Sequence, residues 1–214
     1  MKRVKPSIET LHDPEKYELL ASVEHAKIKE FVIEQVMKDK MLVPAYMVYQ
    51  TSLFLVGLFF ITRAIILAWK GEAIYLWITL GTILFCFTVL VIVHELLHGL
   101  ALKMTGAPRV RYGGMLIKFI FYAEADKFVL SRKPFLFVAL IPLIVVQVIT
   151  IAGIIIWFYD PFIYFFLILM TFHSFFCSGD VALVTLFFRF PGREVFTYDS
   201  RVEKTSYYFV EKKI

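Results

Sequence analysis

The sequence is short of charged residues and of cysteine. Asp, Glu, Lys and Arg make up 19% of its 214 residues, whereas hydrophobic residues make up 59%. Soluble domains contain about 45–50% apolar residues, so this composition excludes an ordinary water-soluble globule and a disordered chain. The two cysteines, Cys86 and Cys177, both lie in apolar stretches, and no disulfide framework is expected.

Four long stretches contain almost no charge, and each exceeds the roughly 20 residues that a helix needs to cross a bilayer. Their charged residues are Arg63, Glu95 and Asp180. They predict membrane-spanning helices at residues 44–68, 74–102, 134–158 and 161–188. Because the first 40 residues are charged, we expect no cleavable signal peptide, and the first span would serve as the insertion signal.

Basic residues gather outside these stretches. Of the 23 Lys and Arg residues, 21 lie in residues 1–43, 103–133 and 189–214. The positive-inside rule places these segments, and with them both termini, in the cytoplasm. The rule also accounts for the net charge of +5, so we expect membrane lipids and no nucleic acid as partners. The three tryptophans flank the opposite turns, as interfacial anchors do.

The expected fold is an all-α membrane protein with four transmembrane helices and a small β-strand or hairpin inserted between the second and third. Residues 1–43 would form a cytoplasmic amphipathic segment with a helix near Pro14–Lys40, and residues 44–190 the four-span domain. In the 103–133 loop, a strand over Met115–Ala123 would place Ile117, Phe119 and Phe121 on one face and Lys118 and Tyr122 on the other. Residues 191–214 would form a cytoplasmic tail, either a strand or partly disordered.

The second stretch ends in His94-Glu95-Leu96-Leu97-His98. Residues four apart differ by about 40° around a helix axis, so the two imidazoles project to one side and Glu95 stands about a quarter turn away. Two such nitrogens can bind zinc, a third protein ligand leaves one tetrahedral position for water, and Glu95 can act as general base. The alternative is a pair of histidines hydrogen-bonded between helices beside a protonated Glu95.

Asp180 is the preferred third ligand. It lies about eight residues from the cytoplasmic end of its span, and His94 and His98 lie about eight and four residues from theirs, which gives similar depths at 1.5 Å per residue. Three rivals remain open. His173 is about 10 Å further along the helix, too deep for direct ligation, and would polarise substrate, support a ligand or pack. Cys177 offers a soft thiolate, and Glu124 a downstream carboxylate.

This combination resembles the site-2 protease class of intramembrane zinc metallopeptidases, and most closely the small bacterial membrane proteins called putative zincin peptidases. The similarity covers roughly residues 90–190. Its motifs are His94-Glu95-Leu96-Leu97-His98-Gly99, a turn at Tyr112-Gly113-Gly114, Ser131-Arg132, Ala139-Leu140-Ile141-Pro142 and Ser178-Gly179-Asp180. The resemblance implies His94, His98 and Asp180 as ligands of one zinc ion, Glu95 as base and a bacterial cell membrane as location. The chain departs from the class at one point, because Gly179 precedes Asp180 instead of following it.

The predicted function is therefore hydrolysis of a peptide bond in a membrane-embedded or juxtamembrane substrate by an intramembrane zinc metallopeptidase. A strand edge in the 103–133 loop could bind that substrate in an extended form, although a surface anchor without substrate contact is the alternative. The competing function is a non-catalytic membrane protein that keeps a structural metal site for partner binding. A metal or proton transporter is a third reading, disfavoured because the polar groups cluster at one depth.

Overall fold

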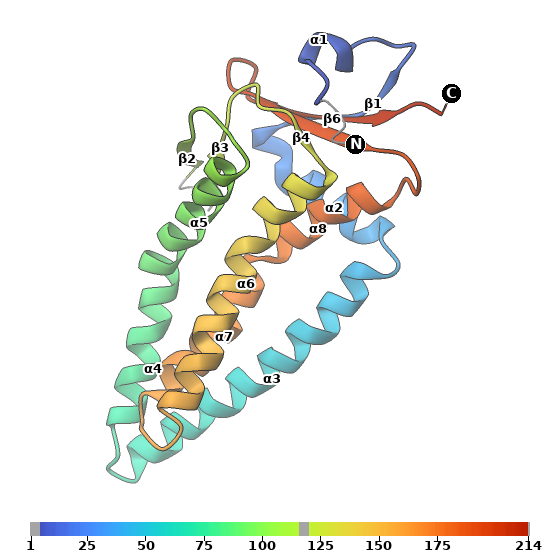
Figure 1. The fold of residues 1–214 in the computed structure, drawn as a ribbon. Coiled ribbons are helices and arrows are strands. Elements are labelled where there is room, and N and C mark those ends of the chain that lie inside the picture. The colour runs from blue at the N-terminus through green and yellow to red at the C-terminus, as the bar shows by residue number, and fades with distance from the viewer. Residues whose placement is uncertain (1–4, 116–119, 214) are drawn as a thin grey trace.

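The computed structural model describes residues 5–115 and 120–213 as a helical bundle with a small sheet at one end (Figure 1). The helices are α3 (Leu42–Trp69), α4 (Ile74–Phe85), α5 (Val91–Met104), α6 (Arg132–Ile156), α7 (Ile163–Phe176) and α8 (Ser178–Phe188). A π turn at Cys86–Leu90 joins α4 and α5 into one rod. Three of these units are long and apolar enough to cross a membrane, and α7 with α8, bent by 45°, can form a fourth.

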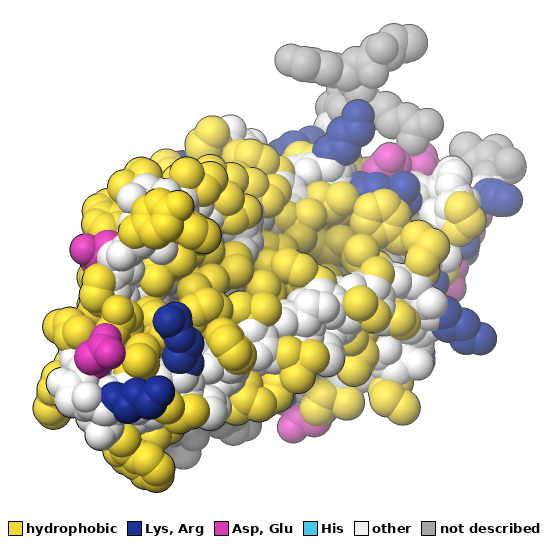
Figure 2. Space-filling model, turned by 90° about the horizontal axis from the view of Figure 1, so that it is seen from below, with side chains coloured by type: hydrophobic (Ala, Val, Ile, Leu, Met, Phe, Trp, Pro, Cys, Tyr) yellow, Lys and Arg dark blue, Asp and Glu magenta, His cyan; other side chains and the backbone are white. Residues whose placement is uncertain are grey.

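The outer surface of the bundle is apolar. Large side chains such as Phe59, Ile92 and Ile155 are more than 60% exposed, and Figure 2 shows hydrophobic side chains over most of the visible helical surface. A helix that is apolar all round is typical of a membrane span, because water would penalise such a surface. The predicted apolar helices are thus confirmed in length and composition.

The sheet corrects the all-α prediction. Four antiparallel strands pair in the order β1-β6-β5-β4. They are β1 (Tyr17–Glu24), β6 (Thr205–Glu211), β5 (Val195–Ser200) and β4 (Leu130–Ser131). The last residues of the chain therefore form two of its strands, and both described ends of the chain lie at the sheet (Figure 1).

Both faces of the sheet are covered. On one face, Val195, Tyr208 and Val210 pack with Phe187 of α8, joined by side chains of α2 (Ile28–Lys38) and α6. The other face packs against Leu11 of the short helix α1 (Ile8–Leu11). The sheet thus forms its core against the same α8 that carries Asp180.

The helix expected over Pro14–Lys40 is wrong for its first half. Residues 17–24 form strand β1, and the helical part is α2. A bulge between Leu19 and Ala21 shifts the pairing with β6 and interrupts the usual alternation. Leu20 and Val23 both join the core, and their three-residue spacing imitated a helical face.

The expected hairpin is present and begins where α5 ends. Gly106, with a φ of 95°, follows the helix, and the N–H groups of Gly106 and Ala107 donate to the carbonyls of Lys103 and Leu102, which is the Schellman arrangement. Strands β2 (Arg111–Met115) and β3 (Ile120–Glu124) then pair antiparallel, and β3 packs against α5. The turn expected at Gly113-Gly114 is wrong, because both glycines pair within β2, where the Tyr122 ring lies against Gly113 and leaves no room for a side chain. Ile117, Lys118 and Phe119 of the predicted strand lie outside the described residues.

Candidate metal centre

His94 and His98 share the buried side of α5. Their Nε2 atoms lie 3.0 Å apart, and both residues are at most 9% exposed. Buried residues recur every four positions from Cys86 through Leu90 to His94. Four residues overshoot an α-helical turn by about 40°, and the wider π turn offsets that drift. The π turn therefore keeps the motif on the face that packs inside the bundle.

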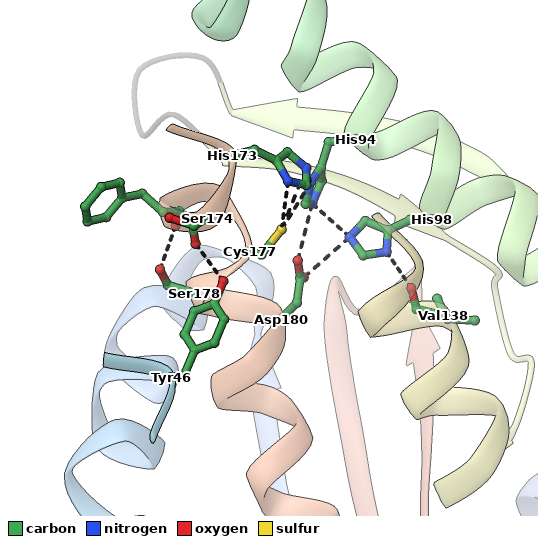
Figure 3. Close-up of polar contacts among 10 residues, drawn as sticks. Tyr46, His94, His98, Val138, His173, Ser174, Cys177, Ser178 and Asp180 are labelled. Atoms are coloured by element: carbon green, nitrogen blue, oxygen red, sulfur yellow. Dashed lines mark hydrogen bonds and ion pairs between the residues drawn. The ribbon is translucent and has the colours of Figure 1, made fainter. Parts of the chain in front are cut away.

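Asp180 in the first turn of α8 completes a three-donor group. Its carboxylate oxygens lie 3.3 Å from His94 Nε2 and 3.4 Å from His98 Nε2, and the three side chains point toward one another (Figure 3). Ligand atoms about 2.0–2.1 Å from a tetrahedral zinc ion lie about 3.3–3.4 Å apart. The spacing of these donors, and their nitrogen and oxygen chemistry, therefore fit zinc.

The break between α7 and α8 sets the position of Asp180. The Ser174 carbonyl accepts hydrogen bonds from Tyr46 Oη at 2.7 Å and Gln50 Nε2 at 2.9 Å, both from α3. Gln50 Nε2 also lies 2.6 Å from Ser178 Oγ. A carbonyl at a helix end needs such partners, because no intrahelical donor reaches it. Sequence reasoning missed Tyr46 and Gln50, although a glutamine in a predicted span is a signal for such a role.

Both histidines have a partner for the ring nitrogen that faces away from Asp180. His98 Nδ1 lies 2.9 Å from the carbonyl oxygen of Val138 on α6, and a carbonyl can only accept, so this nitrogen carries the proton. His94 Nδ1 lies 3.3 Å from His173 Nε2. Partners of this kind fix the tautomer of metal-binding histidines and leave Nε2 unprotonated. His173, predicted to lie too deep for direct ligation, contacts the Nδ1 atom of the candidate ligand His94.

A second group overlaps the first. Donor atoms of His94, His173 and Cys177 also lie within 4.8 Å of one another, with Cys177 Sγ 3.7 Å from His173 Nε2 and 4.0 Å from His94 Nδ1. The two groups share His94 from opposite ring nitrogens. A neutral imidazole has one lone pair for a metal, so the same His94 tautomer cannot serve both groups.

Glu95 lies beside the donors at the edge of a cavity of about 610 Å³. Its Oε2 atom is buried without a hydrogen-bond partner in the described part of the chain, and the backbone of Ala123 in β3 donates to its carboxylate. The cavity is lined by α2, α5, α8 and residues 121–125 of β3 and its end. An unpaired carboxylate oxygen facing a cavity can exchange a proton with a molecule bound there.

Glu124 also lines this cavity and is absent from both donor groups formed by the described residues. Its carboxylate oxygen is 3.6 Å from Arg201 Nε. Burial, with Asp199 and Asp126 nearby, raises the pKa of Glu124 above its ordinary value. Burial likewise raises the pKa of Asp199, whose carboxylate accepts a hydrogen bond from Ser206. The structure thus places the rival ligand Glu124 beside other acidic residues and not among the candidate metal donors.

The comparisons with known proteins agree with this site. A family model described as "putative zincin peptidase" matches residues 87–195, just over half of the chain. Comparison with curated proteins and with solved structures finds no match. The matched segment contains all four residues His94, Glu95, His98 and Asp180 and confirms the resemblance seen in the sequence. The chain belongs to the putative zincin peptidase family.

Proposed function

We propose that this protein is a membrane-embedded zinc metallopeptidase that hydrolyses a peptide bond in a membrane-embedded or juxtamembrane substrate. The observation that carries the proposal is the convergence of His94, His98 and Asp180 at spacings of 3.0–3.4 Å beside the unpaired Oε2 of Glu95. Three protein ligands and a neighbouring carboxylate are the composition of catalytic zinc sites, in which one coordination position stays open.

The proposed membrane orientation follows from charge. The long helices carry apolar surfaces, and 21 of the 23 Lys and Arg residues lie in segments at the end that bears the sheet and hairpin. The positive-inside rule places that end in the cytoplasm. The metal centre then lies just inside the cytoplasmic boundary of a cell membrane, where water and a juxtamembrane peptide can both reach it.

The residues divide the chemistry among them. A bound zinc ion would supply Lewis acidity, which acidifies a coordinated water molecule and polarises the carbonyl of the scissile bond. His94, His98 and Asp180 would hold the ion. Glu95 Oε2 accepts the proton released by the attacking water and returns it to the leaving amine nitrogen. The same carboxylate thus serves first as base and then as acid.

The substrate would bind along β3. One edge of β3 pairs with β2, and residues 121–125 line the cavity that contains Glu95. An extended peptide that adds to this strand would present its backbone to Glu95, and a largely apolar cavity would accept aliphatic or aromatic side chains. We therefore propose an unfolded, apolar peptide segment as the substrate class.

The Glu95→Gln variant tests the proposed function. We expect it to keep one zinc per chain and to lose cleavage, since the amide has the same shape and cannot accept a proton. New N-termini in membrane proteins are to be compared by quantitative proteomics between cells that produce wild type and cells that produce Glu95→Gln. Peptides generated by wild type alone support the proposal. Equal cleavage by both proteins contradicts it.

A non-catalytic metal site is the second candidate. It is favoured by the group of His94, His173 and Cys177, which is buried at 6% exposure or less. Structural zinc sites are closed in this way, whereas catalytic sites keep an open position. Zinc that survives Asp180→Ala but is lost in Cys177→Ser would favour this second function.

A further inference from the structure

Pro142 lies inside α6, one turn after Val138. In an α-helix the N–H of each residue donates to the carbonyl four residues earlier. Proline has no N–H, and its ring clashes with that carbonyl and pushes it outward. Pro142 therefore leaves the carbonyl oxygen of Val138 without its helical donor, in the middle of an otherwise continuous helix.

This carbonyl is the one that contacts His98. Val138 O lies 2.9 Å from His98 Nδ1, and Figure 3 shows it directed from α6 toward the imidazole. The bond places the proton on Nδ1 and turns Nε2 toward Asp180, 3.4 Å away. Any other residue at position 142 would provide an N–H that competes for the same oxygen atom.

We propose that Pro142 is a positioning residue for the metal centre. By withholding a backbone donor from α6, it reserves the Val138 carbonyl for His98 and fixes the tautomer and ring orientation of that ligand. This inference rests on the proposed zinc site and adds to it a residue that touches neither the metal ion nor the substrate.

Replacement of Pro142 by Ala separates this role from a merely structural one. Alanine restores the helical hydrogen bond and favours helix, so the zinc-free variant should unfold at the same or a higher temperature than wild type. Loss of a hydrogen-bond partner behind a metal ligand weakens metal binding by about 10- to 100-fold. We therefore expect weaker zinc binding without loss of fold stability.

The experiment is a titration of detergent-solubilised protein with Zn²⁺ in competition with a chelator. Wild type, Pro142→Ala and Pro44→Ala are compared. Pro44 lies in the first turn of α3, where a missing N–H costs nothing, so its variant is a matched control with unchanged affinity. In parallel, ¹⁵N-histidine NMR of the zinc-loaded proteins should show a hydrogen-bonded His98 Nδ1–H in wild type that changes in Pro142→Ala alone.

The outcomes separate the two proposals. Weaker zinc binding confined to Pro142→Ala, with a changed His98 signal, supports the role of Pro142. Equal zinc affinity in wild type and Pro142→Ala overturns that role, and so does a lower unfolding temperature of zinc-free Pro142→Ala. Neither result contradicts the metal centre itself. Absence of zinc binding in wild type overturns the metal centre itself.

Discussion

Asp180→Ala removes the carboxylate from the three-donor group and should weaken zinc binding strongly. Zinc sites with four protein ligands bind with about 10–16 kcal/mol, so one ligand contributes roughly 2.5–4 kcal/mol. At about 1.4 kcal/mol per factor of ten, this corresponds to a loss of roughly 10²- to 10³-fold in affinity. The donor spacings of 3.0–3.4 Å require no rearrangement before binding, so the full contribution of the ligand should be measurable.

Zinc-dependent thermal unfolding is the assay. Zinc at 100 times the dissociation constant stabilises wild type by about 2.7 kcal/mol, or roughly 5–10 °C in Tm for a chain of this length. At the same zinc concentration, a variant with 100-fold weaker binding gains about 0.4 kcal/mol and roughly 1 °C. Asp160→Ala, in the turn before α7, is the matched control and should respond to zinc like wild type.

One result would refute the reasoning. If Asp180→Ala keeps the full zinc-dependent shift in Tm, the third ligand is not Asp180. Loss of the shift in Glu124→Ala would then assign the third ligand to Glu124, and loss in Cys177→Ser would assign it to the group of His94, His173 and Cys177. Elemental analysis of the same samples distinguishes weak binding from a change in stoichiometry.

Two further predictions concern stability. Burial raises the pKa of Glu124 above its ordinary value of 4.5, so its stabilising contribution is greatest below about pH 4 and falls as pH rises through the folded-state pKa. Glu124→Gln should therefore raise Tm relative to wild type at about pH 8 and not at about pH 4. Equal differences in Tm at both pH values would contradict the raised pKa of Glu124. A side chain at Gly153 in α6 would collide with the ring of Phe166 in α7, so Gly153→Ala should destabilise the bundle by about 1–3 kcal/mol. Gly81→Ala, in α4 with open space around it, should leave Tm unchanged or raise it, and a matching loss in both variants would exclude the clash as the cause.

Local patterns were readable from the sequence. The apolar stretches predicted the long helices, because the length and hydropathy of a span are properties of about 20 consecutive residues. The spacing of His94 and His98 predicted two ligands on one side of a helix, because four residues make slightly more than one turn. The apolar run after Met115 likewise indicated a strand or hairpin in the 103–133 loop, where the structure forms β2 and β3. The turn expected at Gly113-Gly114 was wrong, because both glycines are paired residues of β2.

Contacts between distant segments were not readable. Strand β1 pairs with β6, almost the whole chain away, so its eight residues show no local sign of their partner, and the bulge at Leu20 obscured the alternation that would have indicated a strand. The depth argument selected Asp180, and the structure brings its carboxylate within 3.4 Å of both histidines. The depth argument gave no sign that Gln50 and Tyr46 would satisfy the carbonyl at the α7–α8 break.

The sequence by itself determined that the chain is apolar and helical and that it resembles zincin peptidases. Hydropathy and the His94–His98 spacing are patterns of nearby residues, so they can be recognised within a single helix. Only the tertiary structure decided which groups support the candidate metal ligands. The Val138 carbonyl and His173 reach His98 and His94 from other helices. Pro142 marks the Val138 carbonyl in the sequence as one without a helical donor, but only the packing of α6 against α5 brings that carbonyl to a candidate ligand.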